Sequence, residues 1–254
     1  MYMDKETVVL KKRLLDLANQ SYKNNMYTFS GFLSLHEQQL IEEICRENPY
    51  ICVKLYGGNT DCERMIARFG NPEELGYQEE FPICCIKIEP LIEKFADTLT
   101  HRDFLGAVMN LGIERNTIGD IFVQGKSAFL FCHSKIAEYL LDELDKVKHT
   151  HVRCHFIECI DELPVSEPVS KEVLVSSCRL DCVIAKIYSI SRAGSLELFR
   201  SGKVFVNGKL TENNSYTLKE KDSVTVRGFG RFKFVSECSR TKKDKLRILI
   251  EVNK

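Results

Sequence analysis

The chain has 254 residues, enough for one large or two to three small domains, and its 36 basic residues balance its 36 acidic ones. Eleven scattered cysteines, an odd number, argue against a secreted disulfide scaffold and favour free thiols in a reducing cytoplasm. Because no apolar run approaches about 18 residues and the N-terminus lacks the apolar core of a signal peptide, the sequence predicts a soluble cytoplasmic protein with no membrane partner.

The zero net charge hides an asymmetry along the chain. Residues 179–254 hold 17 basic and 8 acidic residues, whereas residues 1–178 hold 19 basic and 28 acidic ones. Counterion release on binding a phosphate backbone depends on the local cations and not on the sum over the chain. A basic C-terminal domain behind an acidic body therefore indicates a nucleic-acid partner, although two halves that merely differ in composition would give the same counts.

Residues 1–80 are predicted to form a mainly helical N-terminal subdomain. Amphipathic helices are expected from Asp4 to about Asn25 and from Ser34 to Glu47. The elements expected next are a strand at Ile51–Tyr56, a glycine turn at 57–60 and a helix that holds Glu63, Arg64 and Arg68. A glycine turn before a helix can cradle an anion. Without a following Lys-Ser/Thr pair, however, a simple turn is the favoured interpretation.

Residues 81–163 are predicted to form a ferredoxin-like, RRM-like plait. Apolar periodicities give the order β-α-β-β-α-β, with elements at Ile83–Ile88, Arg102–Leu111, Asp120–Gln124, Ala128–Cys132, Ile136–Val147 and Val152–Glu158. Phe129 and Phe131 have the spacing by which such a sheet stacks bases, but strand alternation favours core positions for both. The overall fold class is therefore predicted to be α+β.

Proline and acidic residues between Asp161 and Pro168 mark a linker, assigned to residues 164–175, before a C-terminal domain at residues 176–254. The first helix of that domain is expected to start at a Ser176 or Ser177 N-cap, with Asp181 in its first turn.

A second short helix is predicted from Arg192 to Ser201, capped by Ser191 and ended by Gly202. The pair Asn207-Gly208 between two apolar stretches then predicts a type I′ hairpin. This order of parts places cations from two helices and a hairpin on one exposed patch, as an RNA-binding module requires. The residues expected to contact RNA are Arg179, Lys186, Ser191, Arg192, Ser195, Arg200, Lys203, Asn207, Lys209, Arg227 and Arg231. A second RNA contact is expected at Arg64, Arg68, His101, Arg102, Arg115 and Lys126.

The C-terminal motifs resemble the S-four RNA-binding domain, named after the fourth small-subunit ribosomal protein. The resemblance rests on Arg179-Leu180-Asp181, Ser191-Arg192, the run from Ser201 to Lys209, and residues 224–228. The chain departs from that domain at Ala193 and Gly194, where a hydroxyl and often a basic residue are usual. Gly194 also weakens the helix by about 0.5–1 kcal/mol relative to alanine.

A second resemblance covers nearly the whole chain from about Phe32. Tyr56-Gly57-Gly58, the stretch from Thr100 to Ile113, residues 118–121 and the segment from Arg227 to Lys233 are similar to the YlmH family of bacterial RNA-binding proteins. The resemblance implies a ribosome-associated protein that binds ribosomal RNA of the large subunit, and tRNA as well. It also implies support of alanine tailing on stalled large subunits that carry peptidyl-tRNA. A monomer is expected away from the ribosome.

Catalytic and metal sites are not predicted, and no cofactor is expected. Gly119 and Gly125-Lys126-Ser127 imitate a phosphate-binding loop, but the glycine spacing is wrong and a strand follows where a helix is required. The histidines and cysteines of residues 149–159 lack a C-x-x-C pair and alternate between the faces of a strand, so they predict no zinc site. Two alternatives to a non-catalytic RNA-binding protein remain: an RNA-modifying enzyme such as a pseudouridine synthase, and a protein-binding adaptor.

Overall fold

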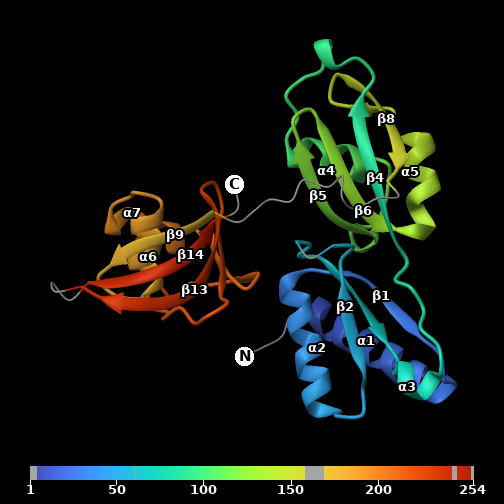
Figure 1. Ribbon diagram of the computed structural model, residues 1–254, viewed down its shortest axis with the longest axis horizontal. Coiled ribbons are helices and arrows are strands. Elements are labelled where there is room, and N and C mark those ends of the chain that lie inside the picture. Colours follow the sequence, from blue (N-terminus) through green and yellow to red (C-terminus); the bar gives the residue numbers. More distant parts are fainter. Residues whose placement is uncertain (1–4, 60, 158–168, 242–244, 253–254) are drawn as a thin grey trace. The chain divides into compact units, whose positions relative to one another are not determined.

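The computed structural model describes residues 5–59, 61–157, 169–241 and 245–252 as a mixed α/β protein. The chain divides into two compact units, Met1–Val165 and Ser166–Lys254 (Figure 1). In the described part of the chain, no helix is long and apolar enough to cross a lipid bilayer.

The first part of unit 1 packs helices against a small antiparallel sheet. Its elements are α1 (Lys5–Asn24), β1 (Thr28–Leu33), α2 (Leu35–Glu47), β2 (Val53–Tyr56), β3 (Met65–Phe69) and α3 (Pro72–Leu75). The sheet order is β1-β3-β2, so β3 is the central strand. The prediction of a helix around Arg64 and Arg68 was wrong because this short apolar segment pairs with strands on both sides. The prediction of a mainly helical subdomain at residues 1–80 also omitted β1.

The second part of unit 1 is a five-stranded antiparallel sheet with two helices on one face (Figure 1). Its main elements are β4 (Ile83–Pro90), α4 (His101–Asn110), β5 (Ile118–Gln124), β6 (Ser127–His133), α5 (Ala137–Glu143), β7 (Lys146–Val147) and β8 (Thr150–Phe156). Three short 3-10 turns accompany them: η1 (Glu93–Phe95), η2 (Arg115–Thr117) and η3 (Ser134–Ile136). The strand order is β5-β6-β4-β8-β7. The second helix was predicted to reach Val147, but it ends at Glu143 because Lys146–Val147 pair with β8.

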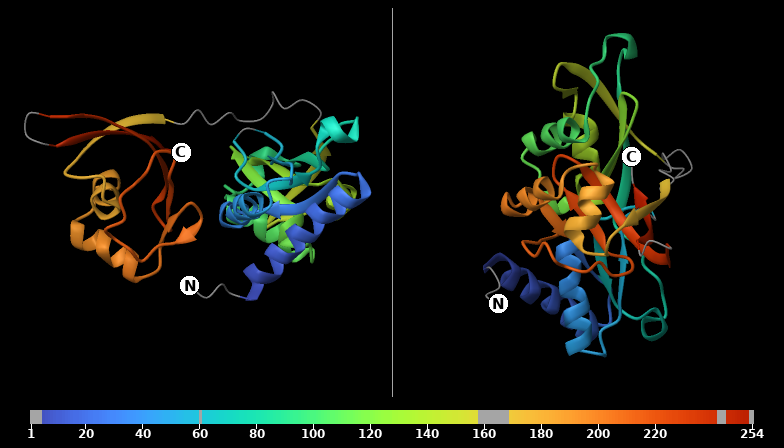
Figure 2. Two further views of the ribbon diagram at one scale, coloured as in Figure 1. Left: turned by 90° about the horizontal axis from the view of Figure 1, so that it is seen from below. Right: turned by 90° about the vertical axis from the view of Figure 1, so that its left-hand side faces the viewer.

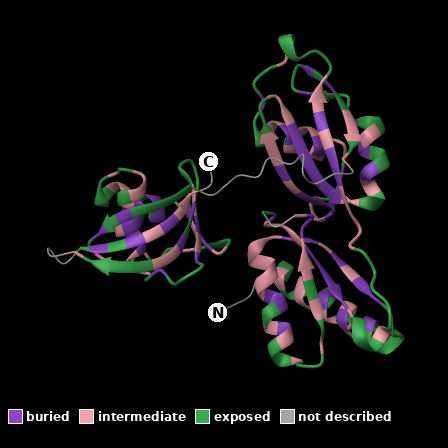
Figure 3. Cartoon of the chain, viewed as in Figure 1, coloured by how far each residue is buried: buried purple, intermediate pink, exposed green. Residues whose placement is uncertain are grey.

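The sheet face opposite α4 and α5 is closed by the chain itself. Strand β6 is buried along most of its length (Figure 3). Its Phe129 and Phe131 are 1% and 2% exposed and pack with Cys62 and Cys85. A Cβ on Gly58 would lie 2.2 Å from the Phe131 ring, so this loop lies directly on the strand. The alternative in which the two phenylalanines stack RNA bases is therefore wrong, because no base can reach rings buried to this extent.

Unit 2 is a six-stranded sheet with α6 and α7 against one face (Figure 2). Its elements are β9 (Val169–Val175), α6 (Leu180–Ile187), α7 (Arg192–Arg200), β10 (Val204–Val206), β11 (Lys209–Leu210), β12 (Ser223–Val226), β13 (Gly230–Arg240) and β14 (Leu246–Val252). The strand order is β11-β10-β12-β13-β14-β9. Residues 169–175 of the predicted linker form the edge strand β9, because Val173 and Val175 are buried in the core. Residues 164–168 of that linker lie outside the described residues.

The ten described cysteines are free thiols. Burial raises the pKa of Cys62 and Cys85 to about 12 and that of Cys154 to about 11, so these thiols are protonated and unreactive at neutral pH. Cys159 lies outside the described residues.

Candidate nucleic-acid interface

A buried carboxylate at the start of α6 holds two arginines of the predicted site. Asp181 is 1% exposed, and the Nε of Arg179 donates to its Oδ1 at 3.1 Å while the Nη2 of Arg179 donates to Oδ2 at 3.2 Å. Arg192, at the first position of α7, donates to Oδ2 from Nε at 3.3 Å and from Nη2 at 3.2 Å. The side chains of Arg179 and Arg192 are 39% and 62% exposed, so both guanidinium groups reach solvent.

The electrostatics of this cluster favour a fixed pair of cations. Burial would raise the pKa of Asp181, but hydrogen bonds from Arg179 and Arg192 outweigh it and hold that pKa below its ordinary value. The hydrogen bond to Asp181 raises the pKa of Arg179. One negative charge thus orients two positive ones. Because each guanidinium has five N–H donors, both arginines retain donors for an anion such as a phosphate.

The helix caps are explained by local contacts. The Ser191 hydroxyl accepts from the backbone N–H of Gly194 at 3.0 Å, which confirms the predicted N-cap of α7. The prediction of a Ser176 or Ser177 cap was wrong, because Arg179 is the N-cap residue and α6 begins at Leu180.

Ser195 is not available to RNA. Its side chain is fully buried, and its hydroxyl donates to the carbonyl oxygen of Asp181 at 3.0 Å. The assignment of Ser195 as an RNA contact is therefore corrected: Ser195 ties α7 to α6 beneath the two arginines.

Four further predicted cations are exposed, each on a different element. Lys186 lies in the last turn of α6, Arg200 in the last turn of α7, Lys203 just before β10, and Lys209 at the start of β11. Arg200 is 76% exposed, and its contact with Glu197, 3.6 Å away and 68% exposed, is a surface ion pair of little energetic weight. These four side chains meet the accessibility that an RNA contact requires.

Asn207 has a structural role in the hairpin. Asn207 and Gly208 have φ values of 50° and 76°, which confirms the predicted turn with two left-handed residues. The Asn207 side chain donates to Asp222 at 2.9 Å and accepts from the backbone N–H of Ser223 at 2.9 Å. Asn207 is therefore corrected from a predicted RNA contact to a residue that ties β10 to β12.

Arg227 and Arg231 belong to the other face of the sheet. Val204, Val206, Val224 and Val226 point toward the helices and are buried, so the alternate positions face away from them. Arg227 lies over the Phe205 ring, 4.5 Å from the centroid, and the Nε of Arg231 donates to the Ser223 hydroxyl at 2.7 Å. The predicted RNA contacts Arg227 and Arg231 therefore lie on the sheet face that points away from α6 and α7, whereas Arg179 and Arg192 lie at the starts of these helices.

In unit 1, Arg64 and Arg115 join the two sheets. The Nε of Arg64 donates to the carbonyl oxygen of Ile118 at 3.0 Å, and its Nη2 donates to that of Phe32 at 2.9 Å. Arg115 donates to the same Ile118 oxygen at 2.6 Å. Burial and the neighbouring Arg64 lower the pKa of Arg115 to about 10. Both arginines are corrected from RNA contacts to residues that connect the two sheets, because their buried guanidinium groups donate to backbone carbonyl oxygens.

Two other predicted cations are also engaged internally. Arg68 is 3% exposed, lies between the rings of Tyr27 and Phe81, and donates to the carbonyl oxygen of Glu79. Lys126 donates to the carbonyl oxygens of Glu93 and Ala96, each at 2.8 Å. Arg68 and Lys126 are therefore corrected as RNA contacts, because they fix neighbouring loops.

His101 and Arg102 remain at the surface, in the first turn of α4. Burial of part of its ring and the nearby charge of Arg115 lower the pKa of His101. Of the second predicted contact, these two residues alone keep an exposed position among the described side chains.

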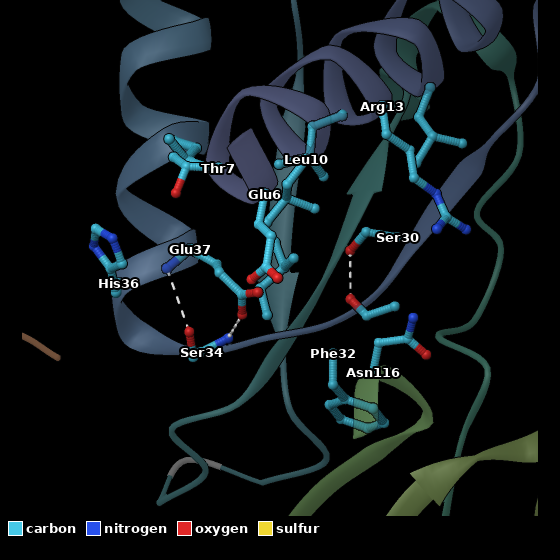
Figure 4. A pocket seen from close by; sticks show the side chains of 15 residues that line it. Glu6, Thr7, Leu10, Arg13, Ser30, Phe32, Ser34, His36, Glu37 and Asn116 are labelled. Carbon is cyan, nitrogen blue, oxygen red and sulfur yellow. Dashed lines mark hydrogen bonds between the residues drawn. The ribbon is translucent and has the colours of Figure 1, made fainter. Parts of the chain in front are cut away.

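A pocket of about 340 Å³ lies between α1, α2 and β1 (Figure 4). At its edge, Ser34 and Glu37 exchange the two hydrogen bonds of a capping box. Ser30 accepts from the N–H of Ala67 at 2.9 Å, so polar groups along the lining support the local fold.

Across the described ranges, no three His, Cys, Asp or Glu residues are grouped so that they could hold a metal ion.

Comparisons with known proteins give three findings. A family model described as "Putative RNA-binding domain in YlmH" matches residues 77–161. The chain is 29% identical over 230 residues to the "Ribosome-associated protein quality control protein P2" of Bacillus subtilis (strain 168), which covers 89% of this chain and 87% of that relative. The "Cell division protein ylmH from Streptococcus pneumoniae" has a similar fold, with a TM-score of 0.51 and 20% identity over 64% of this chain and 98% of that one.

Proposed function

We propose that this chain, which is similar to the YlmH proteins in these comparisons, is a non-catalytic RNA-binding protein that docks on ribosomal RNA of the large subunit. The observation that carries the proposal is the buried carboxylate of Asp181, which fixes Arg179 and Arg192 with their outer N–H groups toward solvent. Phosphate contacts from oriented arginines position a protein on RNA.

The proposal assigns the binding role to the helix side of unit 2. This helix-side surface consists of Arg179, Lys186, Ser191, Arg192, Arg200 and Lys209. Lys203 remains a proposed RNA contact beside Arg227, whose backbone N–H donates to the Lys203 carbonyl oxygen at 2.9 Å. Unit 2 corresponds in this proposal to the S-four domain, here starting at β9. Residues 81–163 correspond to the RRM-like plait, because the strand order β5-β6-β4-β8 with two helices on one face is the order of such a plait.

The cellular task follows from the relatives. The Bacillus subtilis protein is named for ribosome-associated quality control, and we assign the same process to this chain in the cytoplasm. In this role it would act as a monomer on stalled large subunits, contact tRNA as well as ribosomal RNA, and support alanine tailing. Arg102 and His101 would give unit 1 a second RNA contact.

Cosedimentation with purified large ribosomal subunits tests the proposal. Lys186→Ala and Arg200→Ala remove exposed cations that play no part in the Asp181 cluster, so both variants should stay folded. Each should weaken binding and reduce the slope of log affinity against log salt by about 0.9 per lost phosphate contact. Wild-type protein that fails to sediment with large subunits, or RNA that changes mass after incubation with it, would refute the proposal.

A further inference from the structure

The sheet face that points away from α6 and α7 carries a second cationic surface. In register across the strands, Leu210 lies opposite Phe205, Phe205 opposite Thr225, and Thr225 opposite Arg231. Arg227 follows β12 on the same side and lies over the Phe205 ring. We call these residues, Phe205, Leu210, Thr225, Arg227 and Arg231, the outer-sheet platform.

The outer-sheet platform contains no carboxylate. On the neighbouring half of the same face, two cations pair with carboxylates. Arg247 pairs with Glu172 at 3.3 Å, and Lys233 lies 3.8 Å from Glu251.

In the outer-sheet platform, the planar guanidinium group of Arg227 lies over the Phe205 ring. Arg227 is exposed, and its guanidinium carbon lies 4.5 Å from the centre of a ring that is itself only partly buried. Unpaired nucleic-acid bases stack on aromatic rings and on arginine planes, whereas the faces of bases in a duplex are stacked on one another and are not available to a side chain. The exposed Leu210 extends the apolar part of the platform beside the ring.

We propose that the outer-sheet platform is a separate subsite for single-stranded RNA, in which an unpaired base stacks on Arg227 and Phe205. The inference rests on the proposed function and extends it, because unit 2 would then hold structured RNA on its helix side and an unpaired segment on its sheet side. Arg231, whose Nε donates to the Ser223 hydroxyl, lies at the edge of this subsite.

The full-length chain and an unstructured RNA of about 12 nucleotides with a central 2-aminopurine provide the test, because single-stranded sites span about 4–16 nucleotides. Stacking of the modified base should change its fluorescence on binding. Arg227→Ala should weaken binding about 5-fold or more and reduce this signal. Arg227→Lys keeps the charge, so it should lose the stacking signal while the salt slope stays unchanged.

Two further variants complete the design. Phe205→Leu keeps an apolar side chain but removes the ring, and should weaken binding like Arg227→Ala, with thermal unfolding as the check on its fold. Arg247→Ala is the matched control: the same residue type on the same sheet face, but paired with Glu172, and it should bind the strand as the wild type does.

The outcomes separate this inference from the proposed function. If Arg227→Ala binds the strand with wild-type affinity and signal, the outer-sheet platform is not a stacking site, and Arg227 merely covers Phe205. If wild-type protein sediments with large subunits but does not bind the single-stranded RNA, only the proposed subsite is refuted. Protein that binds neither overturns both.

Discussion

Replacing Asp181 by asparagine tests whether the buried carboxylate positions the two arginines or only reduces the local charge. Hydrogen bonds to charged groups contribute about 1.5–3 kcal/mol each, but Arg179 and Arg192 are partly exposed, so water replaces much of what is lost. We expect Asp181→Asn to lower the free energy of unfolding of unit 2 by about 2 kcal/mol. For a domain of this size the melting temperature should fall by about 10 °C, measured by calorimetry on the full chain.

The effect on RNA binding distinguishes the two roles. Removing the carboxylate of Asp181 also removes its repulsion of a phosphate on the far side of the guanidinium groups, about 8 Å away, which is about 0.5 kcal/mol in water. Releasing two side chains that must then be ordered on binding costs about 0.5–1.5 kcal/mol each. If positioning prevails, Asp181→Asn should weaken binding to large subunits by about 0.5–2.5 kcal/mol, or about 2-fold to 70-fold. A folded Asp181→Asn protein that binds more tightly than wild type would refute the positioning role.

Glu197→Gln is the matched control for this substitution. Glu197 is 68% exposed and lies 3.6 Å from Arg200, so losing its charge should change stability by no more than about 0.5 kcal/mol. Glu197→Gln removes one negative charge, as Asp181→Asn does, but leaves Arg179 and Arg192 held by Asp181. Tighter RNA binding is therefore expected for Glu197→Gln, opposite to the change expected for Asp181→Asn.

The stabilisation by Asp181 should depend on pH in a defined direction. The pKa of Asp181 is lower in the folded protein than in the unfolded chain, because of the hydrogen bonds from Arg179 and Arg192. Its contribution is complete above the unfolded value of about 4 and is lost as the pH falls through the folded value. The stability difference between wild type and Asp181→Asn should therefore shrink on acidification below that range, as chemical denaturation at several pH values would show.

Two further predictions concern unit 1. Arg68→Ala should lower the free energy of unfolding by about 2–4 kcal/mol without changing RNA affinity, because Arg68 is buried between two rings. Arg102 is exposed, so Arg102→Ala should weaken RNA binding without lowering the free energy of unfolding. Equal RNA affinities of the Arg68→Ala and Arg102→Ala proteins would contradict the assignment of Arg102 as an RNA contact and of Arg68 as a buried structural residue. Gly58→Ala should destabilise by more than about 2 kcal/mol, since its φ is +115° and the new Cβ would lie 2.2 Å from Phe131. Gly125→Ala, at φ +60° in open space, should cost only about 1 kcal/mol, and similar melting temperatures for the two glycine variants would be inconsistent with the packing of this loop.

The sequence alone determined the features that are decided within a few residues. The hairpin followed from Asn207-Gly208, because both positions require positive φ. The N-cap of α7 followed from Ser191, whose hydroxyl reaches a backbone N–H three residues away. The order β4, α4, β5, β6, α5 and β8 likewise followed from apolar periodicity, whereas the short strand β7 did not.

Only the tertiary structure decided which cations reach solvent. Arg64 donates to Ile118, 54 residues away, and Arg68 inserts between rings from two other segments, so no local pattern distinguishes them from an exposed arginine such as Arg102. Long-range pairing also made β3 a strand, because its partners lie in β1 and β2. Tertiary structure also placed Arg192 on the helix side of the C-terminal sheet and Arg227 on the opposite face. The physical reason is that burial and charge pairing depend on contacts between distant segments, whereas helix caps and tight turns are fixed by neighbouring residues.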